Sequence, residues 1–144
     1  MDIIFRAAEL NDSESLYPLV CDLSSQDFSI DLFKDRFESI LTSPIDQILV
    51  PTSQGSPVGF IHLNKIESLT SGSFAEVRSL YVNTSFRNKG IGRALLERAG
   101  LQASEMGIET LRVRTNILRT GNSDFFEKAG FTLFKQQHVF EKKC

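Results

Sequence analysis

The segment most suggestive of chemistry is FRNKGIG, residues 86–92, which lies between the alternating run SLYV and the helical pattern ALLERAG. Gly90 and Gly92 carry no side chain, so a ligand can approach the backbone amides around them closely. If a helix begins here, those amides lie at the positive end of its dipole. Three basic residues add charge at the rim: Arg87, Lys89 and Arg93. The segment predicts a phosphate site, although a tight turn would also explain the two glycines.

The loop matches neither of the two most common nucleotide-binding patterns. It is not a P-loop, because no GK[ST] follows the glycines. It is not GxGxxG either, because Ala94 and Leu95 stand at the wrong places for that pattern. The predicted ligand is therefore a diphosphate of another kind.

The elements that must position this loop follow from hydrophobic periodicity. Apolar runs and alternation predict strands over 3–8, 46–52, 57–66, 73–82 and 109–115, with a final strand or hairpin over 131–143. Apolar residues at helical spacing predict helices over 13–23, 30–41, 91–106 and 122–130. We expect Pro18 to kink the first helix or end its first part near Tyr17, an oxygen of Asn11 or Asp12 to cap that helix, and Gly100 to mark close packing in the third. The order predicts an α/β (α+β) fold with a mixed, mostly antiparallel central sheet and about four flanking helices.

Length and composition limit the class of protein. A chain of 144 residues with 41% hydrophobic and 24% charged residues fits a single globular domain, residues 1–144, and excludes a disordered or fibrous chain. No apolar run approaches the roughly 18 residues of a membrane span, and the N-terminus does not resemble a signal peptide, so we expect a cytoplasmic protein without a membrane partner. Cys21 and Cys144 have no CxxC spacing, so neither a disulfide framework nor a metal site is predicted.

Charge is unevenly divided along the chain. Residues 1–76 hold 12 acidic and 4 basic residues, whereas residues 77–144 hold 6 acidic and 12 basic residues. Such a chain can hold an anion at one end of a cleft and a cation at the other. A solvated surface with uneven charge is the alternative explanation.

Three segments resemble, in order, those of the GNAT (Gcn5-related N-acetyltransferase) superfamily. The loop fits the superfamily's [QR]xxGx[GA] motif after an LYV strand, with the residues Arg87, Asn88, Lys89, Gly90, Ile91 and Gly92. FRAAELND resembles the opening strand and helix cap, and RTNILRTGNSDFFEKAGF resembles the C-terminal FYEKxGF segment. The resemblance covers nearly the whole chain. It implies acetyl-CoA as cosubstrate and a splayed sheet whose fourth and fifth strands separate around the pantetheine arm.

The resemblance also implies residues that contact the cofactor. The pantetheine arm would bond to the backbone of Leu80, Tyr81 and Val82, and the pyrophosphate would lie on the amides of residues 88–93. Asn116 and Arg119 stand near the place where relatives contact CoA, and a surface residue at a helix start is the alternative reading of Arg119. Phe126 replaces a tyrosine that protonates the departing sulfur in many relatives, so that role does not carry over to this chain.

A base is needed because an ordinary alkylamine, with a pKa near 10.4, is almost entirely protonated at neutral pH. Glu76 falls where some superfamily members place a general-base glutamate, and strand alternation places it on one face with Arg78, Leu80 and Val82. A structural ion pair with Arg78 is the alternative reading. His62 would lie near Glu76 if the hairpin register brings the two onto one face, and a structural histidine is again the alternative.

Two functions from different classes follow. The first is an N-acetyltransferase acting on a primary amine of a cationic acceptor, either a small molecule or a protein, that is attracted by the acidic first half. The second is a non-catalytic acyl-CoA-binding module. An anionic cofactor accounts for the basic second half, so no nucleic-acid partner is expected. A homodimer would be in keeping with the resemblance.

Overall fold

The computed structural model describes residues 2–115 and 122–144. The chain divides into two compact units, Met1–Arg114 and Thr115–Cys144. No helix in the described part of the chain has the length and apolar character needed to cross a membrane.

The first unit is built on a mixed sheet, as predicted. Its described strands are β1 (Ile3–Ala7), β2 (Asp46–Ser53), β3 (Ser56–Pro57), β4 (Gly59–Ser68), β5 (Gly72–Val82) and β6 (Leu111–Val113). They are ordered β1-β2-β4-β5-β6, with β3 paired to β2. All pairs are antiparallel except β5 with β6, which is parallel. The predicted mixed, mostly antiparallel fold is confirmed.

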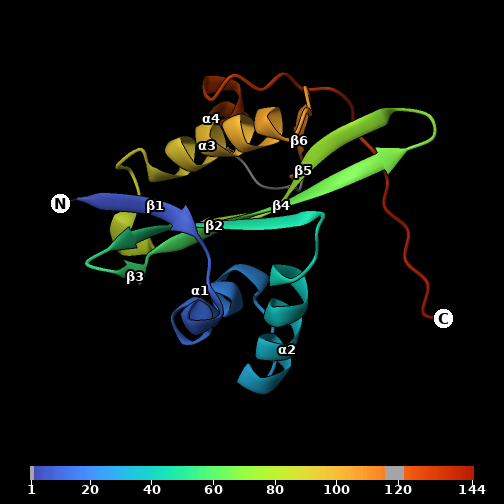
Figure 1. Ribbon diagram of the computed structural model, residues 1–144. Helices are drawn as coiled ribbons and strands as arrows, with labels where there is room; N and C mark the ends of the chain where they lie inside the picture. The colour runs from blue at the N-terminus through green and yellow to red at the C-terminus, as the bar shows by residue number, and fades with distance from the viewer. Residues whose placement is uncertain (1, 116–121) are drawn as a thin grey trace. The chain divides into compact units, whose positions relative to one another are not determined.

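Helices cover both faces of this sheet (Figure 1). On one side lie α1 (Ser13–Ser24) and α2 (Ile30–Leu41), and on the other lies α3 (Ile91–Glu105). The core between α1, α2 and the sheet joins both helices to β2 and β4. It contains six buried side chains: Leu16, Leu19, Phe33, Phe37, Val50 and Phe60. The helical spacing seen in the sequence therefore corresponds to real packing faces.

Pairing between β5 and β6 is short. β5 pairs with β6 only over Ala75–Val77, and within the described residues the following part of β5, residues 78–82, has no partner on that edge. An unpaired strand edge presents amides and carbonyls that a ligand can bind.

A β-bulge in β5 changes which residues share a face. Leu63 pairs with Val77 and His62 pairs with Ser79, so Arg78 is the extra residue. Directly paired residues share a face, so Glu76 lies with Ser79, not with Leu80. The predicted common face of Glu76 with Leu80 and Val82 is wrong, because the bulge reverses the alternation.

The expected end of the first part of α1 near Tyr17 is wrong. The helix runs on through Pro18 to Ser24, because its buried residues Leu16 and Leu19 pack in the core on either side of the proline. The alternative expectation of a kink at Pro18 stays a prediction. The expected side-chain cap is also wrong. Asp12 occupies the N-cap position, but its carboxylate makes no cap bond there. It forms a bidentate pair with Arg6, with both N–O distances at 2.8 Å.

Gly100 is not in a tight contact, contrary to expectation. A Cβ built at this position meets no atom within 4 Å. Gly100→Ala is therefore expected to stabilise the protein by about 1 kcal/mol and to raise Tm by about 2–4 °C in a thermal melt. Gly107→Ala is the opposite control, since Gly107 has a φ of 76° that disfavours alanine. A lower Tm for Gly100→Ala would contradict the open site.

In the second unit, the described residues form α4 (Asn122–Lys128). Phe126 contacts Phe125 and Phe131, with ring centroids 5.1 and 5.7 Å away. The chain then turns at Gly130, whose φ is 95°. The strand or hairpin expected over 131–143 is wrong: residues 131–144 form neither helix nor strand, because no described segment pairs with them.

Candidate functional site

The chain leaves β5 through a short 3-10 turn (Thr84–Phe86) and enters α3 at Ile91. The segment FRNKGIG, residues 86–92, which joins these elements, is called the glycine loop below. Asn88 and Gly90 both have left-handed backbone, with φ of 61° and 80°. Alternation of left- and right-handed residues curls the chain so that successive amides converge on one concave surface. Glycine is needed at residue 90 for this conformation and not for space, since a Cβ there meets no atom within 4 Å.

The amides of this loop are available to a ligand. Among the hydrogen bonds of the described residues, none has an amide of residues 88–93 as donor, and the first amide of α3 with a backbone acceptor is that of Ala94, which donates to Gly90 at 3.0 Å. These six N–H groups lie at the N-terminus of a helix of 15 residues. Such a site favours an anion.

The basic side chains of the loop are held at its rim. Arg87 donates through Nε to the carbonyl of Val82 at 2.8 Å, and its guanidinium lies 5.1 Å from the Tyr81 ring centroid. Lys89 lies over Phe86, and Arg93 pairs with Glu97 at 3.7 Å. The two contacts of Arg87 place it beside the unpaired part of β5, where Leu80, Tyr81 and Val82 lie.

Glu76 is buried and holds two arginines. Arg78 donates to Oε2 at 2.8 Å, and Arg114 donates to Oε1. Burial raises the pKa of Glu76, but the two guanidinium groups outweigh that effect and leave its pKa below the ordinary value. A carboxylate stabilised in this way is a weak proton acceptor, so the arrangement favours the ion-pair reading. The catalytic role of Glu76 stays a prediction.

The ion pairs of Glu76 give a testable effect on stability. Because its folded pKa is lowered, its contribution is present above the ordinary glutamate pKa of about 4.3 and is lost as pH falls through the folded value. Glu76→Gln is expected to reduce the free energy of unfolding by about 1–3 kcal/mol at pH 7, since two guanidinium groups lose their charged partner. The deficit relative to wild type should shrink in urea melts as pH falls below about 4. An equal deficit at pH 7 and pH 3 would contradict this account.

A second acid lies across the sheet on the same face. Asp46 Oδ1 is 2.8 Å from His62 Nε2 and 2.9 Å from Asn64 Nδ2. Burial raises the pKa of Asp46, but the hydrogen bonds from His62, Asn64 and Ser43 leave it below the ordinary value. A charged Asp46 favours the tautomer of His62 that carries its proton on Nε2. The other ring nitrogen, Nδ1, then has a free lone pair and no hydrogen-bond partner among the described residues.

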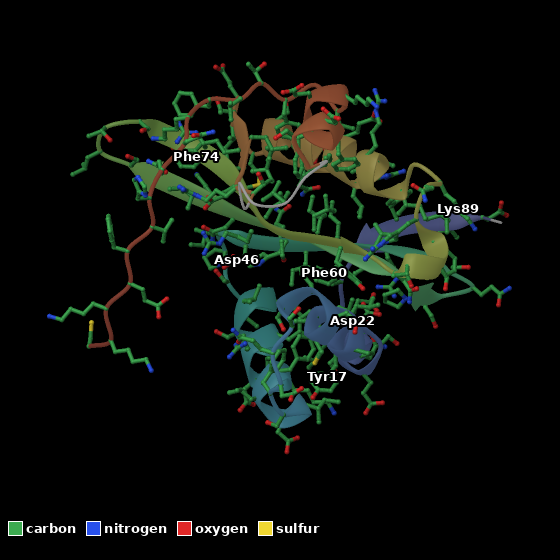
Figure 2. All side chains as sticks on the ribbon, turned by 180° about the vertical axis from the view of Figure 1, so that it is seen from behind. Tyr17, Asp22, Asp46, Phe60, Phe74 and Lys89 are labelled. Carbon is green, nitrogen blue, oxygen red and sulfur yellow. The ribbon has the colours of Figure 1, made fainter. Side chains whose placement is uncertain are left out.

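His62 also lines a cavity of about 300 Å³ between the sheet and the layer of α1 and α2. The remaining lining residues are mostly apolar: Leu16, Val20, Leu23, Ser24, Phe33, Arg36, Phe37, Ile40, Ile48, Phe60 and Ser79. Ser79, which pairs with His62 across β4 and β5, lies in the part of β5 that has no partner on its other edge among the described residues. Figure 2 shows Phe60 between the sheet and the layer that holds Tyr17 and Asp22, with Lys89 of the glycine loop farther along the same unit. The cavity lining therefore includes one residue, Ser79, of the unpaired part of β5.

Sequence reasoning found the loop but missed the partner of His62. The register meets the condition under which His62 would share a face with Glu76, since Asn64, two residues after His62 on β4, pairs with Glu76. The hydrogen-bond partner of His62 is instead Asp46, at the start of β2. An alignment of the two strands around the SQGS turn could have suggested it, because Asp46 and His62 are both polar residues on apolar strands.

Three predicted cofactor residues are not located at the site. Asn116 and Arg119 lie outside the described residues. Phe126 lies in the second unit, whose placement relative to the first is not determined. Their roles stay predictions. No group of three or more His, Cys, Asp or Glu residues suited to a metal ion occurs in the ranges 2–115 and 122–144.

Comparison with known proteins gives consistent matches. Residues 44–133 match the model of an acetyltransferase (GNAT) domain. The chain is 30% identical over 134 residues to the aminoalkylphosphonate N-acetyltransferase of Salmonella typhimurium, covering 92% of this chain and 85% of that protein. Its fold is similar to a putative acetyltransferase from Agrobacterium tumefaciens, with a TM-score of 0.87, 23% identity and coverage of 96% and 99% of the two chains. It is also similar to glucosamine-6-phosphate N-acetyltransferase from Arabidopsis thaliana, with a TM-score of 0.85, 19% identity and coverage of 99% and 100%.

Proposed function

Because this chain belongs to the GNAT acetyltransferase family, we propose that it transfers the acetyl group of acetyl-CoA to a primary amine by direct attack on the thioester. The predicted family and the predicted enzyme class, an N-acetyltransferase, are confirmed by the matching proteins. We further propose which cosubstrate is used, which residues bind it and what kind of acceptor receives the acetyl group.

The observation that carries the proposal is the group of six unbonded amides at residues 88–93, beside an unpaired strand edge. The diphosphate of CoA would accept hydrogen bonds from these amides, and Arg87, Lys89 and Arg93 would add positive charge. The pantetheine arm, which carries amide groups of its own, would bind the edge of β5 at Leu80–Val82 in the manner of an added strand.

The acceptor would occupy the cavity under β4 and β5. A volume of about 300 Å³ corresponds to about ten water molecules, which suits a small molecule better than a protein segment. The Salmonella relative, which by its name acts on aminoalkylphosphonates, supports a small-molecule amine. The cationic acceptor predicted from the acidic first half is one form of this proposal.

His62 would remove the proton from the acceptor. An imidazole oriented by a carboxylate is a common general base, and here Asp46 holds Nε2 of a histidine that lines the cavity, which leaves Nδ1 as the basic nitrogen. The ammonium gives one proton to Nδ1, and the free amine attacks the carbonyl carbon of the thioester. The C–N bond forms as the C–S bond breaks, the nitrogen loses its second proton to solvent as the amide forms, and CoA leaves as a thiolate that takes a proton from solvent. His62 then returns its proton to solvent. The ion pairs of Glu76 with Arg78 and Arg114 support a structural role for that residue instead.

A non-catalytic acyl-CoA-binding module is the alternative, because Phe126 has no hydroxyl to protonate the leaving sulfur. It predicts CoA binding without thiol release. A thiol-release assay with acetyl-CoA and a panel of amino acids, aminoalkylphosphonates, polyamines, aminoglycosides and lysine peptides separates the two functions. Release that depends on one class of amine supports the acetyltransferase, whereas CoA binding by calorimetry without release for any amine would favour the module.

A further inference from the structure

The lining of the acceptor cavity holds one arginine and no carboxylate. From this we propose that the acceptor amine carries an anionic group, a carboxylate or a phosphonate, that Arg36 binds in the cavity. The inference rests on the proposed function, and it identifies a substrate class and a residue that selects it.

Arg36 is not engaged by an acid of the protein. At helical spacing its neighbours are Leu32, Phe33, Ser39 and Ile40, so α2 offers it no carboxylate. No ion pair or hydrogen bond joins its side chain to another described residue. Lys34, two residues earlier on the same helix, is by contrast paired with Glu14 at 3.5 Å.

Arg36 is an exposed residue whose guanidinium lies over an aromatic ring, a contact that uses none of its donors. Its Cζ atom lies 5.5 Å from the centroid of Phe28. Contact with a ring face is a favourable position for a guanidinium and leaves the N–H groups free. The planar fork of N–H donors matches the two oxygens of a carboxylate or phosphonate.

The rest of the lining argues against a polycationic acceptor in the cavity. Eight of the twelve lining residues are apolar, and the polar ones besides Arg36 are Ser24, His62 and Ser79. A second ammonium group would lose its water there without gaining a carboxylate partner, which is costly. The lining therefore suits an acceptor with one amine near His62, an apolar body and one anionic group near Arg36.

The acidic residues of the helical layer act at longer range. Asp22 accepts a hydrogen bond from Tyr81 at 3.3 Å, and Glu14 is paired with Lys34. The remaining carboxylates of the layer are exposed and absent from the lining: Asp27, Asp31, Asp35 and Glu38. Exposed charges are screened over about 8–10 Å, so contact with Arg36 decides which group is bound inside.

The test uses acceptors that share one apolar body. Leucine and its aminophosphonate analogue carry the anion, whereas leucinamide and 3-methylbutylamine do not, and spermidine represents the polycations. For wild type we expect kcat/KM to be at least about 10-fold higher for the anionic acceptors than for the neutral ones. The ratio of leucine to its phosphonate analogue then distinguishes the two anions.

Three variants test whether Arg36 is the residue that binds the anionic group. Arg36→Gln is expected to raise KM for the anionic acceptors by about 10- to 100-fold and to leave kcat/KM for 3-methylbutylamine within about 2-fold. Lys34→Gln removes the same charge from the same helix outside the lining and should change neither value. Arg36→Lys should recover part of the affinity, since it restores the charge without the fork.

Two results would overturn the inference while leaving the proposed function in place. One is a neutral amine or spermidine used as well as the anionic acceptors by wild type. The other is an equal loss for anionic and neutral acceptors in Arg36→Gln. Thiol release with none of these or the panel amines would overturn the proposed function and this inference together.

Discussion

Replacing His62 with Gln is expected to lower kcat for amine acetylation by about 100-fold or more at pH 7, because a positioned general base contributes roughly 100- to 10,000-fold. The glutamine amide can still donate to Asp46, so the hydrogen bond that holds Asp46 at 2.8 Å is kept while the basic nitrogen is lost. The Kd for CoA should not change, since the glycine loop and the edge of β5 are untouched. The rate of thiol release at saturating substrates gives kcat, and calorimetric titration gives the Kd for CoA.

The defect should also depend on pH in a particular direction. As the pH approaches the acceptor's own pKa, near 10 for an alkylamine, more of the amine is already neutral and a base matters less. The ratio of wild-type to variant kcat should therefore fall between pH 7 and pH 9.5. A purely structural role for His62 would leave that ratio constant, because a distorted cavity does not recover at alkaline pH.

Glu76 provides the comparison that decides between the two bases. If His62 is the base, Glu76→Gln should lower stability while changing kcat at pH 7 by less than about 10-fold when it is measured well below Tm. If Glu76 is the base, the pattern reverses, with a large loss of kcat in Glu76→Gln and a small one in His62→Gln. His138→Gln makes the same chemical change at an exposed histidine of the second unit and controls for the substitution itself.

The elements of the fold could be predicted because each has a local cause. Apolar alternation marks β2, β4 and β5, and the two glycines with a following apolar stripe mark the loop and α3. The end of the helix predicted near Tyr17 is wrong because the local cost of Pro18 is offset by packing of Leu16 and Leu19, which only the assembled core supplies. Local sequence therefore identifies an element better than it identifies its continuity.

The site could be predicted only in part, since its two halves depend on different information. The amides at residues 88–93 follow from one segment, whereas the pairing of His62 with Asp46 depends on the register of two strands. The single extra residue at Arg78 has no local signal, yet it puts Glu76 and Leu80 on opposite faces of the sheet. A one-residue irregularity in a strand is enough to change which side chains can meet, so the cavity and its lining needed the three-dimensional arrangement.

Replacing Gly90 with Val is expected to weaken CoA binding by at least about 100-fold. Gly90 has a φ of 80°, and a β-branched residue is strongly disfavoured in that region. The backbone would leave the left-handed conformation and turn the amides of residues 88–93 away from a common point, so several charge-assisted hydrogen bonds to the diphosphate would be lost at once. Calorimetric titration with CoA and with pantetheine, which lacks the diphosphate, measures the effect. Pantetheine should bind wild type and variant equally, and Gly100→Ala in the same helix should bind CoA as wild type does. An unchanged Kd for CoA in Gly90→Val would mean that the diphosphate is bound elsewhere, and a parallel loss for pantetheine would mean that the substitution disrupts β5 instead of the loop.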